Sequence, residues 1–214
     1  MPSRTSLQRP VLWIATRNRG KTREFQSLLG AGWSVRDLHA LPWMKEIRET
    51  GRTFLSNAKI KAMAVSRALP ERLVLADDSG LVVPALGGKP GVRSARFSGL
   101  RATNESNRMK LLKMMKKIPK GQRKAYFQAT LVLGRSGQVL GVQTARVWGR
   151  ITESELGSGG FGYDPIFQPV GYRKTFGQLS ERTKDRISHR GKAARGIRKL
   201  LSRYKVLSAC RSNI

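Results

Sequence analysis

The chain has 214 residues, 39% of them hydrophobic and 7% aromatic, which is enough to fold around a sizeable core. No apolar run approaches the roughly 20 residues that a membrane-spanning helix needs, and Arg17 and Arg19 leave no apolar signal segment behind the N-terminus. The single cysteine, Cys210, excludes an internal disulfide and a cysteine-based metal site. These features predict a cytoplasmic globular protein with no membrane partner.

Positive charge dominates the chain, because 42 lysines and arginines oppose 13 aspartates and glutamates, for a formal net charge of +29. Such an excess favours contact with polyanions such as nucleic acid or phosphorylated substrates. The basic residues are spread along the chain, with local concentrations only at 113–124 and 182–211, which fits ordinary solvated positions equally well. The charge therefore permits nucleic acid as a partner without leading us to expect it.

Short apolar runs alternate with helical periodicities and predict an α/β fold without repeats. The predicted strands are 11–16, 33–38, 73–76, 124–133 and 138–148, and the predicted helices are 21–29, 53–69, 103–117 and 186–204. A hairpin turn is expected at 134–137. The elements predict one domain at 11–204, with an N-terminal extension at 1–10 and a C-terminal tail at 205–214.

An acidic doublet, Asp77-Asp78, follows the predicted strand 73–76. Carboxylates at the end of a buried strand need water, hydrogen bonds or a cation. Because side chains alternate along a strand, the two should point to different sides, so that one could hold metal while the other orients water. An Asx turn leading into Ser79-Gly80 explains the doublet equally well.

Three further motifs each have a functional and a structural interpretation. T-x-N-x-x-K at 16–21 places a lysine in the first turn of a helix, where a phosphate can bind, or it forms an ordinary strand–helix turn. S-H-R-G at 188–191 offers donors to a purine oxygen, or it caps a helix. G-G-F-G-Y-D-P at 159–165 can set Phe161 against a base, or it is a tight turn with buried aromatic residues.

In this order, the motifs resemble those of the inosine triphosphate pyrophosphatase family, whose members remove non-standard purine nucleotides. The resemblance runs from about Val11 to about Leu201. It is carried by T-R-N-R-G-K at 16–21, E-T-G-x-T-F at 49–54, N-A-x-x-K-A at 57–62, A-D-D-S-G-L at 76–81, G-G-x-P-G-V-x-S-A-R at 87–96, G-G-F-G-Y-D-P-I-F at 159–167 and I-S-H-R-G-K-A at 187–193.

The resemblance implies a long, mixed, twisted central sheet flanked by helices, two lobes around a substrate cleft, and a homodimer. It implies hydrolysis of ITP, dITP and XTP to the monophosphate and pyrophosphate. Magnesium would be held by Glu49 and Asp78, Asp78 would also activate water, and Asp77 and Lys61 would support that site. The implied substrate-binding residues are Thr16, Arg17, Asn18, Arg19, Gly20, Lys21, Ser79, Phe161, Gly162, Tyr163, Asp164, Lys184, His189 and Arg190.

The sequence departs from the family pattern at four positions. Ser56 and Pro84 stand where the family usually has acidic residues, and Asn104 and Asp185 replace the usual Asp and Asn. Fewer carboxylates predict a less negative cleft and an altered or weaker hold on metal.

Two other hypotheses stay open. The fold could serve a nucleic-acid-binding protein with weak or lost catalysis, as the charge would allow. It could also serve a pyrophosphatase of pyrimidine nucleotides, against which the 188–190 loop argues, because its donors suit a 6-keto purine.

Overall fold

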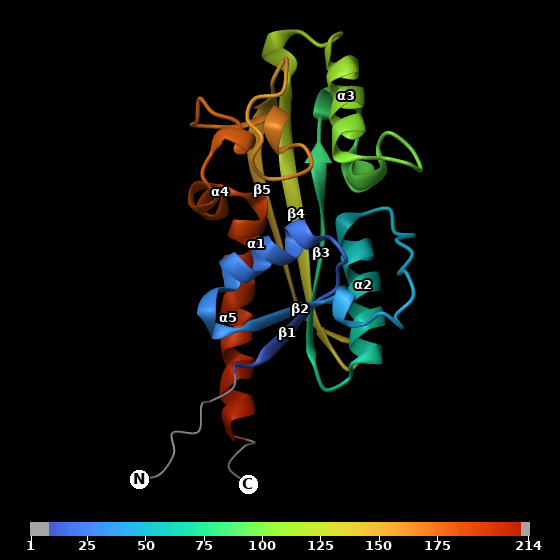
Figure 1. Cartoon of the computed structure of the whole chain (residues 1–214), viewed down its shortest axis with the longest axis vertical. Helices are drawn as coiled ribbons and strands as arrows, with labels where there is room; N and C mark the ends of the chain where they lie inside the picture. The colour runs from blue at the N-terminus through green and yellow to red at the C-terminus, as the bar shows by residue number, and fades with distance from the viewer. Residues whose placement is uncertain (1–8, 211–214) are drawn as a thin grey trace.

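Residues 9–210 are described by the computed structural model of the protein, with side chains as far as Tyr204, and their strands form one mixed sheet (Figure 1). The strands, in spatial order, are β2 (Ser34–Asp37), β1 (Val11–Ile14), β3 (Leu73–Val82), β4 (Lys124–Arg135), β5 (Gln138–Ile151) and β6 (Phe167–Pro169). β1 pairs in parallel with β2 and β3, whereas the pairs from β3 to β6 are antiparallel. The predicted mixed sheet is confirmed.

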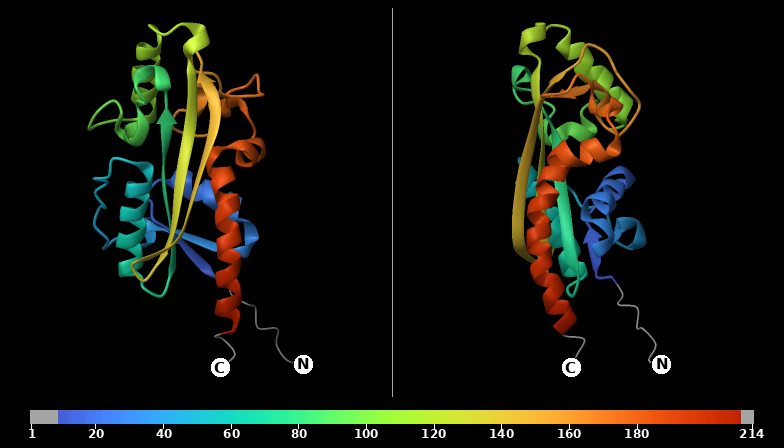
Figure 2. Two further views of the ribbon diagram at one scale, coloured as in Figure 1. Left: turned by 180° about the vertical axis from the view of Figure 1, so that it is seen from behind. Right: turned by 90° about the vertical axis from the view of Figure 1, so that its left-hand side faces the viewer.

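Helices cover both faces of this sheet, and Figure 2 shows the longest of them, α5, running along the length of the strands. α2 packs on β3 and β4 from one side, while α5 packs on β4 and β5 and contacts α1. The helices are α1 (Arg19–Leu29), α2 (Phe54–Ala68), α3 (Asn104–Met115), α4 (Glu181–Ile187) and α5 (His189–Cys210).

The alternation of side chains along β4 explains how the core is divided. Its apolar face, with Phe127, Leu131 and Leu133 buried, serves two clusters, one under α1 and α5 and one at the far end of the sheet with α3 and β6. On the opposite face of β4, Val132 belongs to a third cluster, which lies under α2. The two ends of the sheet therefore form two lobes, each with its own apolar packing.

The predicted hairpin between β4 and β5 is confirmed. Ser136 and Gly137 form its turn with φ angles of 51° and 73°. Two consecutive positive φ angles are characteristic of a type I′ turn, whose twist matches that of the flanking strands.

The prediction that a strand ends before Asp77 is wrong. β3 continues to Val82, and Asp77 and Asp78 pair in register with Leu131 and Thr130 of β4. The doublet therefore lies in the middle of a strand, which excludes the Asx turn, and the carboxylates need charged partners to be stable there.

The single terminal helix predicted at 186–204 is also wrong, because two helices meet at Ser188. The backbone of Ser188 is extended, and its Oγ accepts a hydrogen bond of 3.0 Å from the Gly191 N–H, as expected of an N-cap residue. The short strand β6 had no counterpart among the predicted elements.

The predicted terminal segments are only partly covered by the structure. Of the expected N-terminal extension and C-terminal tail, residues 1–8 and 211–214 lie outside the described residues. Across the described part of the chain, no helix combines the length and apolar character needed to cross a membrane.

Candidate active site

A cavity of about 130 Å³ lies between the two lobes, and we call it the catalytic cavity. Its walls come from α1, β3, β4, α3, the 161–164 loop and the start of α5, so segments far apart in the sequence meet there. The residues predicted from the sequence that line it are Asn18, Lys21, Glu49, Asp78, Ser79, Phe161, Gly162, Tyr163, Asp164, His189 and Arg190.

Asp77 is fully buried and surrounded by donors. Its Oδ2 lies 2.9 Å from Lys21 Nζ and 3.0 Å from Arg190 Nε, and it also accepts from Ser79 Oγ at 3.0 Å. Burial alone would raise the pKa of Asp77, but the charges of Lys21 and Arg190 outweigh it and hold the pKa well below its usual range. Asp77 is therefore a fixed anion that positions two cations.

Asp78 points to the other side of β3 and converges with Glu49 on one ammonium group. Lys61 Nζ lies 3.1 Å from Asp78 Oδ1 and 2.7 Å from Glu49 Oε1, and it donates to the Asp77 carbonyl at 2.8 Å. Burial lowers the pKa of Lys61, but the carboxylates of Asp78 and Glu49 raise it by more than burial lowers it. The net pKa is raised, so the amine keeps its charge. The two predicted metal ligands are thus held side by side.

The second oxygen of Asp78 has no partner. Oδ2 is buried and makes no hydrogen bond with any described residue. Burial raises the pKa of Asp78, the Lys61 charge opposes this only in part, and the Glu49 charge raises it again. A buried carboxylate oxygen without a hydrogen-bond partner, on a residue that lines the cavity, fits a divalent cation, which prefers oxygen ligands.

Glu24 connects the far wall of the cavity to the acidic doublet. It forms ion pairs with Lys184 and, at 2.9 Å, with Arg190 NH1, while Lys184 Nζ lies 2.8 Å from Asp164 Oδ2. Arg190 NH2 donates to Ser79 Oγ at 2.6 Å, so three of its five N–H groups are engaged by protein partners. These contacts make Arg190 a rigid bridge between α1, β3 and α5.

The glycine-rich loop is held by Asp164. Its Oδ2 accepts from the Phe161 N–H at 2.8 Å, and Gly160 has a φ of 72°. A Cβ at Gly160 would lie 2.2 Å from Asp164 Oδ2, so only glycine fits. The loop presents the Phe161 ring to the cavity, with Lys184 and Arg190 lying 5.1 Å and 5.0 Å from the ring centre.

His189 is buried and neutral. Its ring stacks on Phe127 with centroids 4.7 Å apart, and neither ring nitrogen has a hydrogen-bond partner among the described residues. Burial lowers the pKa of His189 well below 6.5, and the nearby Arg190 lowers it further. A neutral imidazole offers one donor and one acceptor, and neither is used by the described part of the protein.

Some predicted residues do not line the cavity. Arg17 donates to the carbonyls of Leu38 and Met44, at 3.1 Å and 2.6 Å, and so fastens the segment before α2. Thr16 Oγ1 accepts from the Asn18 N–H, and Arg19 lines a separate surface cavity. The remaining predicted residues stand behind the cavity wall in contact with it: Gly20, Lys61, Asp77 and Lys184.

Sequence reasoning missed Glu24 and Phe127. Glu24 lies three residues after Lys21 on the same helix, a spacing that places both on one face and could have indicated it. Phe127 gave no such signal, because its contact with His189 joins β4 to the start of α5.

The departures from the family pattern fall at different places. Asn104 lines the cavity, whereas Pro84 is exposed at the start of a short 3-10 turn. Ser56 forms a capping box with Thr53 at the start of α2, and Asp185 accepts a hydrogen bond from Ser27 Oγ. Only Asn104 therefore changes the charge of the cavity wall directly.

Converging carboxylates beside buried cations suit the chemistry of phosphate anhydrides, so the fold and the cavity are those of an α/β protein equipped to bind a polyphosphate. The sequence model of the Ham1 family matches residues 12–200, and the chain belongs to this family. The predicted family membership and enzyme class are confirmed, and none of the comparisons supports a nucleic-acid-binding protein without catalysis.

Relatives and solved structures agree with this membership. The chain is 46% identical to the dITP/XTP pyrophosphatase of Geobacillus kaustophilus, over 84% of this chain and 88% of the relative. It is 42% identical to the dITP/XTP pyrophosphatase of Halalkalibacterium halodurans, over 88% and 98%. The structure of the Staphylococcus aureus Ham1 protein superimposes with a TM-score of 0.79 at 36% identity, covering 90% of this chain and 98% of that one.

Proposed function

We propose that this protein hydrolyses ITP, dITP and XTP to the nucleoside monophosphate and pyrophosphate in the cytoplasm. The observation that carries the proposal is the convergence of Glu49 and Asp78 on Lys61, with Asp78 lining the cavity and its Oδ2 left without a hydrogen-bond partner among the described residues. The names of the relatives, dITP/XTP pyrophosphatases at 42–46% identity, support the same reaction.

Charge in the cavity supports a magnesium ion on Glu49 and Asp78. Around the cavity, five paired cations, Arg96 included, face five carboxylates. The protein charges there leave no positive surplus, and a bound triphosphate adds further negative charge. When bound, magnesium would offset that charge and polarise the phosphate oxygens.

The residues of the chain would share the remaining work. Lys21 and the N-terminal N–H groups of α1 would hold the polyphosphate, since Asn18 caps this helix beside the cavity. Asp78 would accept a proton from water as the water oxygen bonds to the α-phosphorus. The bond from the α-phosphorus to the bridging oxygen then breaks, and pyrophosphate leaves with the electron pair.

The base end of the cavity supports selection of 6-keto purines. A neutral His189 can donate one hydrogen bond to the keto oxygen, whereas the amino group of adenine would leave that donor unpaired at a cost of about 1–3 kcal/mol. The aromatic ring of Phe161 provides an apolar wall for the base.

Product analysis tests the proposed reaction. ITP is incubated with the protein and magnesium, and phosphate is measured with and without added inorganic pyrophosphatase, alongside chromatography of the nucleotides. We expect inosine monophosphate, phosphate only after pyrophosphatase is added, and no reaction with a chelator. Formation of the diphosphate and free phosphate, or equal turnover of UTP, would contradict the proposal.

We also propose that the protein acts as a homodimer, as the family resemblance implies. Light scattering in solution tests this, and a mass equal to that of one chain at micromolar concentration would exclude it.

A further inference from the structure

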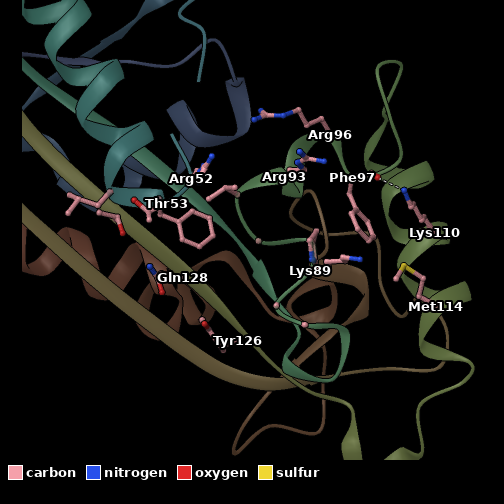
Figure 3. Close-up of a pocket in the computed structure, with 18 of the residues that line it drawn as sticks. Arg52, Thr53, Lys89, Arg93, Arg96, Phe97, Lys110, Met114, Tyr126 and Gln128 are labelled. Atoms are coloured by element: carbon pink, nitrogen blue, oxygen red, sulfur yellow. Dashed lines mark hydrogen bonds between the residues drawn. The ribbon is translucent and has the colours of Figure 1, made fainter. Parts of the chain in front are cut away.

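A second and larger hollow lies on the face of the sheet that is covered by α2. Its volume is about 960 Å³, and Figure 3 shows cationic side chains entering it from three separate segments. We call it the basic groove and define it by Arg52, Lys89, Arg93, Arg96 and Lys110. Arg52 precedes α2, Lys110 belongs to α3, and the other three lie between β3 and α3.

The cations of the basic groove are almost uncompensated. No acidic residue lines it, and Arg52, Lys89 and Arg93 form no ion pair with any described residue. Arg96 alone reaches a carboxylate, that of Glu49, at 3.5 Å. Clustered like charges repel one another, so an extended anion is the ligand that such a surface favours.

Aromatic side chains continue from the groove onto the open face of β4 and β5. Tyr126 lines the groove and lies 4.6 Å from Trp148, centre to centre, and Trp148 is 39% exposed. Arg146 stacks over Tyr126 at 4.8 Å, and Lys124 lies 4.7 Å from the Trp148 ring. Aromatic faces beside cations on an open sheet are the usual platform for unpaired bases.

We propose that the basic groove and the adjoining Tyr126–Trp148 face bind single-stranded nucleic acid. The cations supply contacts for successive phosphates, and the rings supply surfaces on which bases stack. A duplex would offer the phosphates but not the stacking, because its bases are already paired. A mononucleotide would fill only a part of a surface that extends from α3 to β5.

Charge disfavours a second copy of the chain as the occupant. A twofold contact centred on the groove would bring the same five cations of each copy together, with no acidic residue in the groove to receive them. The groove is also separate from the catalytic cavity, with which it shares only Val92 in its wall. Among the cations of the groove, Arg96 contacts the proposed metal ligand Glu49, so the variants tested below leave Arg96 unchanged.

The test compares two triple variants with the same loss of charge. The first is Arg52→Gln, Lys89→Gln, Arg93→Gln, in the groove. The control, Arg198→Gln, Lys199→Gln, Arg203→Gln, removes three exposed cations of α5, which packs on the opposite face of the sheet. Fluorescence anisotropy measures binding of a labelled oligothymidylate of roughly 20 nucleotides to each full-length protein over a range of salt concentrations.

We expect the groove variant to bind much more weakly, with a slope of log affinity against log salt that is shallower by about 2, since single strands contribute about 0.7 per phosphate contact. The control should keep the slope and affinity of the unmodified protein. Trp148→Leu should weaken binding of the single strand roughly tenfold and leave the affinity for a duplex of the same length unchanged. Hydrolysis of ITP should be equal in all of them, which reports correct folding.

Several results would overturn the proposal. An equal loss of affinity for the oligothymidylate in the groove variant and the control would mean that only the net charge of the protein matters. Tighter binding of duplex than of single strand, or complete competition by inorganic triphosphate at equal phosphate concentration, would exclude a strand-binding surface. Conversion of dimer to monomer in the groove variant would identify the groove as a contact between two copies.

Discussion

The catalytic cavity and the basic groove differ in whether their cations are paired with carboxylates. In the cavity, Lys61, Lys184 and Arg190 are buried and Lys21 is half-buried, and each is paired with a carboxylate. In the groove, five cations face solvent with no acidic residue among the lining side chains.

The difference shows where a strongly basic chain places its few acidic residues. Five of its 13 acidic residues, Glu24, Glu49, Asp77, Asp78 and Asp164, surround the catalytic cavity. Buried charges must be paired to be stable, whereas exposed ones are solvated, so acidic residues concentrate where cations have to be buried. The net charge of +29 is therefore a property of the surface and not of the catalytic site.

Substitution of Asp78 should have the largest effect. Asp78→Asn keeps the shape of the side chain but removes the base and a metal ligand, so release of pyrophosphate from ITP should fall by about 10²–10⁴-fold. The control is Glu71→Gln, which removes a carboxylate that is 78% exposed and far from the cavity. A variant of Asp78 that is as active as the Glu71 control would show that this carboxylate takes no part in the reaction.

Loss of the Arg190 bridge should mainly affect folding. Arg190→Gln leaves the buried charge of Asp77 and the half-buried charge of Glu24 each without one partner, and we expect a loss of about 3–5 kcal/mol in the free energy of unfolding. Arg135→Gln removes an arginine from the exposed Arg135–Glu71 pair and should lose less than about 1 kcal/mol. Denaturant titration measures both, and similar losses in the two variants would contradict the distinction.

The selectivity of the cavity should depend on His189. His189→Phe keeps a ring against Phe127 but removes the donor, so the ratio of ITP to ATP turnover should fall roughly tenfold or more. Phe127→Leu, which removes the stacking partner and leaves the donor, should change this ratio less. Steady-state kinetics with both nucleotides decide between them, and an unchanged ratio in His189→Phe would assign base selection to another residue.

The smallest expected effect is on the pH dependence of stability. Burial and the charge of Arg190 lower the pKa of His189 in the folded chain, while Asp77 opposes this and Lys184 and Lys21 add to it. Protonation therefore favours the unfolded chain, and stability that is present above about pH 6.5 is lost as the pH falls below it. The melting temperature of the unmodified protein should fall relative to that of His189→Phe as the pH falls from 7 to 5, and parallel curves would contradict a buried neutral imidazole.

Local sequence patterns predicted most of the fold, but they placed the acidic doublet at the end of a strand and not in its middle. The stripe of Ala58, Ala62 and Val65 on α2 and the turn at Ser136-Gly137 follow from periodicity and backbone preferences, which act over a few residues. The acidic doublet was misplaced at a strand end because its partners, Lys21 and Arg190, lie 56 and 113 residues from Asp77. A local sequence pattern carries no information about cations that lie so far away in the chain.

The candidate site was predicted to a similar extent and for a similar reason. The acidic doublet and the S-H-R-G motif indicated Asp78 and His189, and the family resemblance indicated Glu49, and all three line the cavity. Glu24 and Phe127 were missed, since their roles depend on how α1 and β4 pack against α5. The direction of Arg17, away from the cavity and toward two backbone carbonyls, is likewise set by tertiary packing.

The most direct test of the account is the ratio of kcat/KM for ITP to that for ATP, measured as pyrophosphate release with magnesium. A buried neutral histidine with a free donor predicts that ITP is preferred by at least about tenfold. A ratio near one would show that the cavity does not read the 6-position of the base, and the proposed function would fail with it.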